Sequence, residues 1–206
     1  MLFNLLVLSA FAVALLLLRR MVNILPSLLA CIIRGKENLN LEASVKLSRD
    51  RNLIAMAMAV PFCLIAFRYR LYNPGYLEGM SENAVLGIYF AIFCTYGLLR
   101  LIVKSLLRPQ KMQRSTYNTA YKASFNFFII GTILLLAVAA ISSVLDLSEI
   151  DTRSAMLWIS ALIYTLFLLR KTQIFSTSCS VFAGFLYLCA LEIIPTGILV
   201  VSAIIF

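Results

Sequence analysis

The stretch from residue 182 to residue 206 is apolar except for one ionisable side chain, Glu192. Pro195 and Thr196 follow within about one helical turn, so they share its face if the stretch is helical. Pro195 cannot donate a hydrogen bond to the carbonyl of Leu191, which brings a carboxyl group, a freed carbonyl and a hydroxyl close together. This grouping is suited to carrying a proton or binding a cation. An acid in hydrocarbon is costly, and it is by default a candidate functional site.

A structural role for Glu192 is the alternative. A protonated carboxyl group can hydrogen-bond to a neighbouring helix, and an ionised one can pair with Arg100 if the helices are staggered. It can equally meet a polar residue of another subunit. The candidate intramembrane polar site is therefore Glu192, Pro195, Thr196 and Arg100. The neutral partners considered for Glu192 are Thr95, Tyr96, Thr132 and Ser160.

The sequence predicts no catalytic residue, metal site or cofactor. It contains no histidine, which removes the commonest transition-metal ligand and the usual general base. The five cysteines form no CxxC pair and lie in or beside apolar runs, so we interpret them as small buried apolar residues. Asp146, Glu149 and Asp151 are interpreted as a solvated turn. No motif typical of nucleic-acid binding is present, and we expect no nucleic-acid partner.

The candidate site requires helices to position it, and the composition predicts that these helices cross a membrane. Hydrophobic residues make up 62% of the 206 residues, and the mean hydropathy is +0.96. About 20 apolar residues span a bilayer as a helix. We therefore expect an all-α integral membrane protein, one transmembrane domain over 1–206, built as a six-span helix bundle. The spans are predicted at about 2–18, 53–67, 84–103, 123–145, 154–169 and 182–203.

The segment between the first two spans is harder to place. Residues 21–33 are apolar but too short to cross alone, and Asn23 and Pro26 interrupt them. This pattern predicts a short interfacial or re-entrant segment after the first span. Residues 34–52 are polar, and we interpret them as a solvated amphipathic helix on the membrane surface, with a docking site for a partner as the alternative.

The distribution of cations predicts the topology. Of the 18 lysines and arginines, three (Arg68, Arg70 and Arg153) fall on one side of the six predicted spans, and all the others fall on the opposite side. Cytoplasmic loops are enriched in lysine and arginine. We therefore expect both termini outside, a location in the bacterial inner membrane, and contacts between the basic loops and anionic lipid headgroups.

The last span resembles a known family. The order of Tyr187, Leu188, Cys189, Glu192 and Pro195 is similar to the C-terminal signature of a family of uncharacterised inner-membrane proteins from Bacteroidetes. A turn at Asn73-Pro74 and the multi-span layout are compatible with it. The resemblance implies a polytopic inner-membrane protein and brings no catalytic residues. It suggests that Glu192 and Pro195 matter.

Two functional hypotheses follow. The first is a non-enzymatic subunit that packs against other membrane-protein subunits in a larger envelope complex, such as one for export, motility or energy coupling. Its small size, packing-type helices and lack of a catalytic set favour it. The second is a small proton- or cation-coupled transporter that uses Glu192. A lipid-handling enzyme is a weaker third interpretation, because it requires a polar cavity open to one leaflet.

Overall fold

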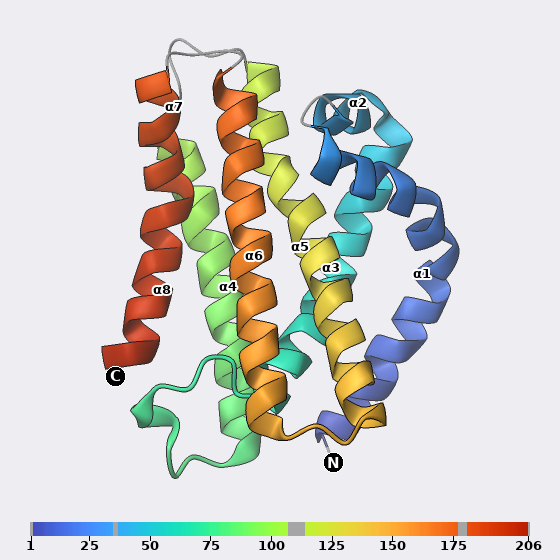
Figure 1. Cartoon of the computed structure of the whole chain (residues 1–206), viewed down its shortest axis with the longest axis vertical. Helices are drawn as coiled ribbons and strands as arrows, with labels where there is room; N and C mark the ends of the chain where they lie inside the picture. The colour runs from blue at the N-terminus through green and yellow to red at the C-terminus, as the bar shows by residue number, and fades with distance from the viewer. Residues whose placement is uncertain (1, 35–36, 107–113, 177–180, 206) are drawn as a thin grey trace.

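The computed structural model describes residues 2–34, 37–106, 114–176 and 181–205, and these form helices without strands. The elements in chain order are α1 (Leu2–Ile33), α2 (Glu37–Ala43), α3 (Val45–Arg68), the 3-10 turn η1 (Gly75–Leu77), α4 (Glu82–Leu106), α5 (Arg114–Val144), α6 (Glu149–Ser176), α7 (Val181–Leu188), the π-helical turn η2 (Cys189–Ile193) and α8 (Ile194–Ile205). Figure 1 shows the long helices side by side. Their arrangement is a single helix bundle.

The predicted all-α architecture is confirmed, and so is the number of helices that could cross a membrane. Six helices of the described chain are long and apolar enough to cross a membrane, and the last of them combines α7, η2 and α8. Several helices extend beyond their predicted spans: α5 begins at Arg114 and α6 runs from Glu149 to Ser176. The reason is that an apolar run marks the hydrocarbon layer, whereas backbone hydrogen bonding continues through polar residues outside it.

The first helix continues past its predicted end. Residues 21–33, predicted as a separate interfacial or re-entrant segment, extend α1 to Ile33 without a break. Arginine is a good helix former, so Arg19 and Arg20 do not stop the helix. Pro26 lies inside it, where the missing N–H bends a helix. Figure 1 shows the last turns of α1 crossing the end of the bundle near α2. Their position relative to a membrane stays a prediction.

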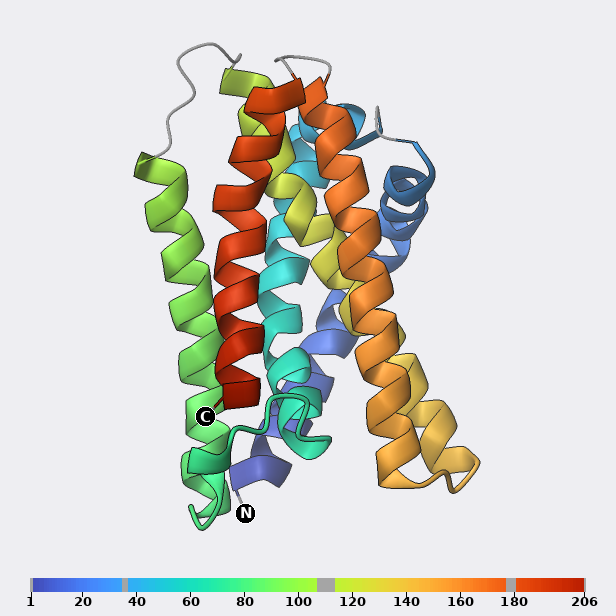
Figure 2. The same cartoon turned by 60° about the vertical axis from the view of Figure 1, so that its left-hand side comes forward.

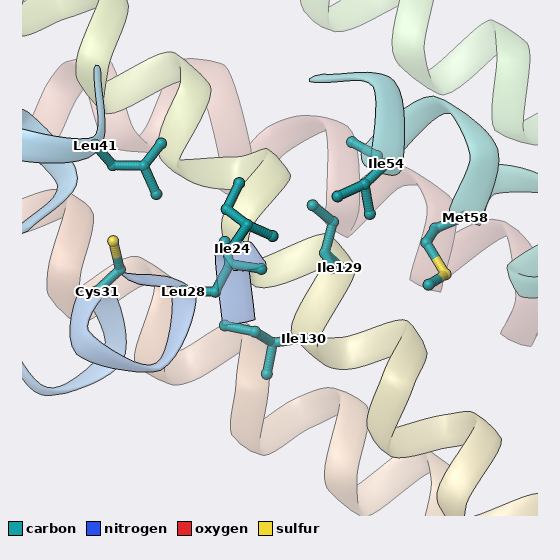
Figure 3. Packing of buried hydrophobic residues seen from close by; sticks show 9 residues of the cluster. Ile24, Leu28, Cys31, Leu41, Ile54, Met58, Ile129 and Ile130 are labelled. Carbon is teal, nitrogen blue, oxygen red and sulfur yellow. The ribbon is translucent and has the colours of Figure 1, made fainter. Parts of the chain in front are cut away.

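The bend in α1 places one apolar face against the bundle. Ile24, Leu28 and Cys31 recur at helical spacing, and all are buried. Figure 3 shows them packed with side chains of α2, α3 and α5, namely Leu41, Ile54, Met58, Ile129 and Ile130. The four cysteines within the described residues are free. Cys31 and Cys63 are buried as predicted, whereas Cys189 is half-buried and Cys94 is exposed on α4, so the prediction of a buried residue is wrong for Cys94; Cys179 lies outside the described residues.

The polar segment 34–52 is not one solvated helix. It breaks at Ser44 into α2 and the start of α3, and Leu41 of α2 is buried. Glu42 of α2 forms salt bridges to Arg51 of α3, at 3.0 Å, and to Lys122 of α5. The Arg51 side chain is only 1% exposed. Burial would raise the pKa of the Glu42 carboxyl group, but the two cations together hold this pKa below its usual value.

Replacing Glu42 by Gln tests whether this ion cluster fastens α2. The change leaves the buried Arg51 without an acid, and we expect the free energy of unfolding in detergent to fall by about 3 kcal/mol. Because the folded-state pKa of Glu42 lies below its usual value of about 4.5, the stabilisation is present above about pH 4.5 and is lost as the pH falls through the folded pKa.

Glu37→Gln is the matched control, because Glu37 lies on the same short helix and its carboxylate accepts a hydrogen bond from the neutral Asn40, with no salt bridge to a described residue. Thermal unfolding of the three proteins over a pH series measures both effects. Equal stability of the Glu42 and Glu37 variants would contradict the proposed fastening.

Candidate functional site

Three charged side chains from different helices meet inside the bundle. Glu192 lies in η2, Arg100 near the end of α4 and Lys171 near the end of α6. One carboxylate oxygen, Oε1, accepts from Arg100 Nη2 at 2.5 Å and from Lys171 Nζ. The side chains of Lys171 and Glu192 are 0% and 1% exposed, and that of Arg100 is 13% exposed. Arg100 and Lys171 are each less than about 10 Å from the ends of their helices along the helix axis.

The local sequence explains why Glu192 sits in an irregular turn. Pro195 has no N–H to donate to the carbonyl of Leu191, so the regular hydrogen-bond ladder is interrupted there. The chain responds with a π-helical turn over Cys189–Ile193, in which the N–H of Ile194 donates to the carbonyl of Cys189. Single π-turns of this kind are frequent at functional sites. Figure 2 shows the three consecutive helical pieces as one rod beside α4.

Two further hydrogen bonds fix this turn. The hydroxyl of Tyr164 on α6 donates to the backbone carbonyl of Glu192 at 3.1 Å. The hydroxyls of Tyr96 on α4 and Thr196 on α8 lie 3.0 Å apart. Glu192 is therefore tied to α6 through both its side chain and its backbone, and the final span is tied to α4 on either side of Pro195.

Aromatic rings surround the two cations. The Arg100 guanidinium lies 5.8 Å from the ring centroid of Tyr96 and 5.6 Å from that of Tyr121. The Lys171 ammonium lies 5.3 Å from the ring of Phe167 and 5.9 Å from that of Phe175. Ring faces attract cations, which offsets part of the cost of removing these charges from water.

The charges of this cluster do not cancel. Glu192 is the one acid that forms a salt bridge with Arg100 or Lys171 among the described residues. With all three groups ionised, the cluster carries one excess positive charge. Arg100 Nε is buried and has no hydrogen-bond partner within the described part of the chain.

A cavity of about 250 Å³ adjoins the cluster. Arg100 and Glu192 lie at its wall, and most of the remaining lining is apolar and comes from α3, α5 and α6. Thr132 and Ser160 also line it, but each hydroxyl donates to a carbonyl of its own helix, Phe128 and Met156 respectively. The cavity is therefore an apolar space with a charged end.

The structure shows which of the partners considered for Glu192 contact this residue. Of the partners considered for Glu192, Arg100 pairs with the carboxylate, and Tyr96 instead contacts Thr196. Thr95 is exposed on α4, and Thr132 and Ser160 bond within their own helices. Among the described residues, no three side chains of the histidine, cysteine, aspartate and glutamate types gather as a metal site would require.

Sequence reasoning missed Lys171. It follows the predicted fifth span, 154–169, and with Arg170 it counts only among the cations that the topology places on the cytoplasmic side. In the structure Arg170 donates to the backbone carbonyls of Ile32 and Ile33, whereas Lys171 faces inward. Adjacent helical residues point in different directions, so one member of such a pair can face inward. The available signal was the pair of phenylalanines four residues on either side, Phe167 and Phe175, which marks an inward face.

We expect Glu192→Gln to lower the free energy of unfolding in detergent by about 3–5 kcal/mol, because it leaves two cations without an acid in the bundle. Adding Lys171→Met to this variant removes one unpaired charge and should recover part of the loss. Glu149→Gln is the control, since its salt bridge to Arg68 is exposed and contributes little. Thermal unfolding measures all four proteins; a Glu192→Gln protein as stable as the unsubstituted one would contradict a structural ion pair.

Comparison with known proteins gives a family without an assigned activity. Residues 1–202 match the profile of a domain of unknown function, DUF4271. No curated protein and no solved structure matches the chain. The match extends over all six spans, including the helices that carry Arg100, Lys171 and Glu192. Because it covers nearly the whole sequence, this chain belongs to the DUF4271 family.

Proposed function

We propose that this protein is a non-enzymatic subunit of a larger assembly in the bacterial inner membrane, such as one for export, motility or energy coupling. The observation that carries the proposal is a face of small residues on α4 that points away from the rest of the chain. Its members are exposed and recur at helical spacing: Ala84, Gly87, Ala91, Cys94 and Thr95. A Cβ placed on Gly87 would meet nothing within 4 Å among the described residues.

Small residues have a specific use in a membrane. Lipid tails are as apolar as leucine, so helices associate there through close packing, which small side chains permit. Faces that only meet lipid have no need of them. The exposed residues of α1 are mostly large, with Leu5, Leu8, Phe11, Leu15 and Leu16 outnumbering Ser9, Ala12 and Ala14, whereas the first half of the exposed α4 face is small and large residues begin only at Leu98. The contrast between the two faces favours a protein partner at α4.

The buried ion pairs favour a structural role for Glu192 over a catalytic one. Glu192 is bonded through its carboxylate to two helices, and this bonding holds the last span in place. The second candidate, a proton- or cation-coupled transporter that uses Glu192, is favoured by the cavity that reaches this residue. A cation that entered there would have to displace Arg100 or Lys171, so we rank it second. If the flux of protons or cations into proteoliposomes is the same after Glu192→Gln, the transporter hypothesis is eliminated.

The orientation follows from the positive-inside rule. Figure 1 shows the start of α3, which carries Lys46 and Arg51, at the end of the bundle that holds α2. The end of α3 and the start of α6, which carry Arg68 and Arg153, lie at the other end. We propose that the α2 end faces the cytosol and both termini face outside. A groove near the start of α3 is lined by Arg19, Arg20, Lys46 and Arg49, and by Asp50, which pairs with Arg20. Its net positive charge suits anionic lipid headgroups.

Labelling of single cysteines tests this orientation. In a cysteine-free background, Lys46→Cys should resist a membrane-impermeant thiol reagent in intact cells and react after lysis. Glu149→Cys, in the loop-proximal first turn of α6, should react in intact cells. Reaction of both positions under the same condition would contradict the six-span topology.

A photo-crosslinking residue in place of Ala91 tests for the partner. In native membranes we expect a covalent adduct with one protein of defined mass, because the α4 face is in contact with it. The same residue at Leu16 of α1, which is 82% exposed, is the control and should crosslink to lipid. Gly87→Leu should abolish the Ala91 adduct while leaving thermal stability unchanged, since no described residue lies within 4 Å of a Cβ at this position.

Purification of the complex provides a second test of the proposed function. Extraction in mild detergent followed by mass spectrometry should recover the same partner in a fixed ratio. A homogeneous monomer together with a lipid-only pattern at Ala91 would overturn the proposed function.

A further inference from the structure

We propose that the cavity beside Arg100 binds a small amphiphilic anion, with a carboxylate or phosphate group against the guanidinium and a slim apolar body between α3, α5 and α6. The juxtaposition that carries this proposal is an apolar cavity whose charged end has an excess of positive charge. The inference is independent of the proposed function, because a subunit of an assembly has no need of a ligand at this place.

The charge balance selects an anion. Arg100 and Lys171 share a single carboxylate oxygen of Glu192, and neither forms another salt bridge to a described residue. A buried charge without a counter-charge is strongly unfavourable in an apolar interior. An incoming anion would neutralise the cluster, whereas an incoming cation would add a second excess positive charge.

The hydrogen bonding places the anion at Arg100 rather than at Lys171. Arg100 lines the cavity and Lys171 does not. Arg100 Nε is buried and unpartnered among the described residues, so the guanidinium retains a donor. Guanidinium groups bind carboxylate and phosphate oxygens through charge-assisted hydrogen bonds, which are shorter and stronger than neutral ones.

The rest of the cavity is lined by apolar side chains, so the ligand must be apolar away from its charged group. Its lining includes Phe62, Phe127, Phe128, Leu135 and Ile163. The rings of Phe62 and Phe128 pack edge to face with centroids 5.3 Å apart, so this wall is preformed. The hydroxyls in the lining that donate within their own helices, on Thr132 and Ser160, offer no donor to a head group. Only the Arg100 end is matched to a charge.

The volume limits the size of the ligand. About 250 Å³ holds roughly eight groups of the size of a water molecule. The pocket is open on one side, so a ten-carbon acid can place its carboxylate and most of its chain inside and leave the chain end outside, whereas a two-chain phospholipid would leave most of its chains outside. The class of ligand is therefore a single-chain acid of medium length.

The test uses the full chain reconstituted in nanodiscs of zwitterionic lipid and radiolabelled decanoate as the probe. Scintillation proximity detects saturable binding, and unlabelled ten-carbon amphiphiles compete for it. We expect decanoate and decyl phosphate to compete, and decanol and decyltrimethylammonium to fail. Equal competition by decanol would show that only hydrophobic partitioning is measured, and it would overturn the proposal.

Two substitutions locate the site. Arg100→Gln should lower the affinity for decanoate by about tenfold or more, the loss expected for a charge-assisted hydrogen bond. Ser160→Leu leaves every charge in place and fills part of the cavity, and it should lower the affinity to a similar degree. This second variant keeps the test valid if Arg100→Gln does not fold.

Lys46→Gln is the matched control, because it removes one positive charge in the first turn of α3, outside the cavity lining. It should bind decanoate with unchanged affinity. A Ser160→Leu protein that binds decanoate as the unsubstituted protein does would contradict the cavity as the site, and an equal loss in Lys46→Gln would indicate a general effect of net charge.

Discussion

The bundle depends on carboxylates that are each shared by two cations. Glu192 joins Arg100 and Lys171, and Glu42 joins Arg51 and Lys122. In both clusters one arginine and one lysine come from helices other than that of the acid. Water does not reach the most deeply buried of these side chains, Arg51, Lys171 and Glu192, so their ion pairs specify which helices lie next to each other. Close packing between apolar helices is far less selective.

The two clusters lie toward the same end of the molecule. The Glu42 cluster joins α2, α3 and α5, and the Glu192 cluster joins α4, α6 and η2. The opposite end has one salt bridge among the described residues, between Arg68 and Glu149, and both side chains are well exposed. The excess of cations that the sequence places on one side therefore does more than contact lipid headgroups, because several of these cations hold the helices together.

The number and type of the helices followed from apolar runs, because hydrocarbon thickness imposes a minimum length that a sequence reveals directly. The ends of the helices were less predictable. For example, α1 continues through Arg19 and Arg20, because charged residues with long side chains do not interrupt a helix. Glu192 stood out as the single acid in an apolar stretch, and Arg100 was one of its foreseen partners. Lys171 was not foreseen, because its inward direction depends on the rotation of α6, which only packing against α5 and α7 decides.

The uneven placement of the ion clusters means that different forces hold the two ends of the bundle. The end near α2 is fastened by the buried charges of the Glu42 and Glu192 clusters. The end near Arg68 and Glu149 is instead held by apolar packing around Ile65, Leu135 and Tyr89. A change of ionisation therefore acts on one end of this molecule and leaves the cohesion of the other almost untouched.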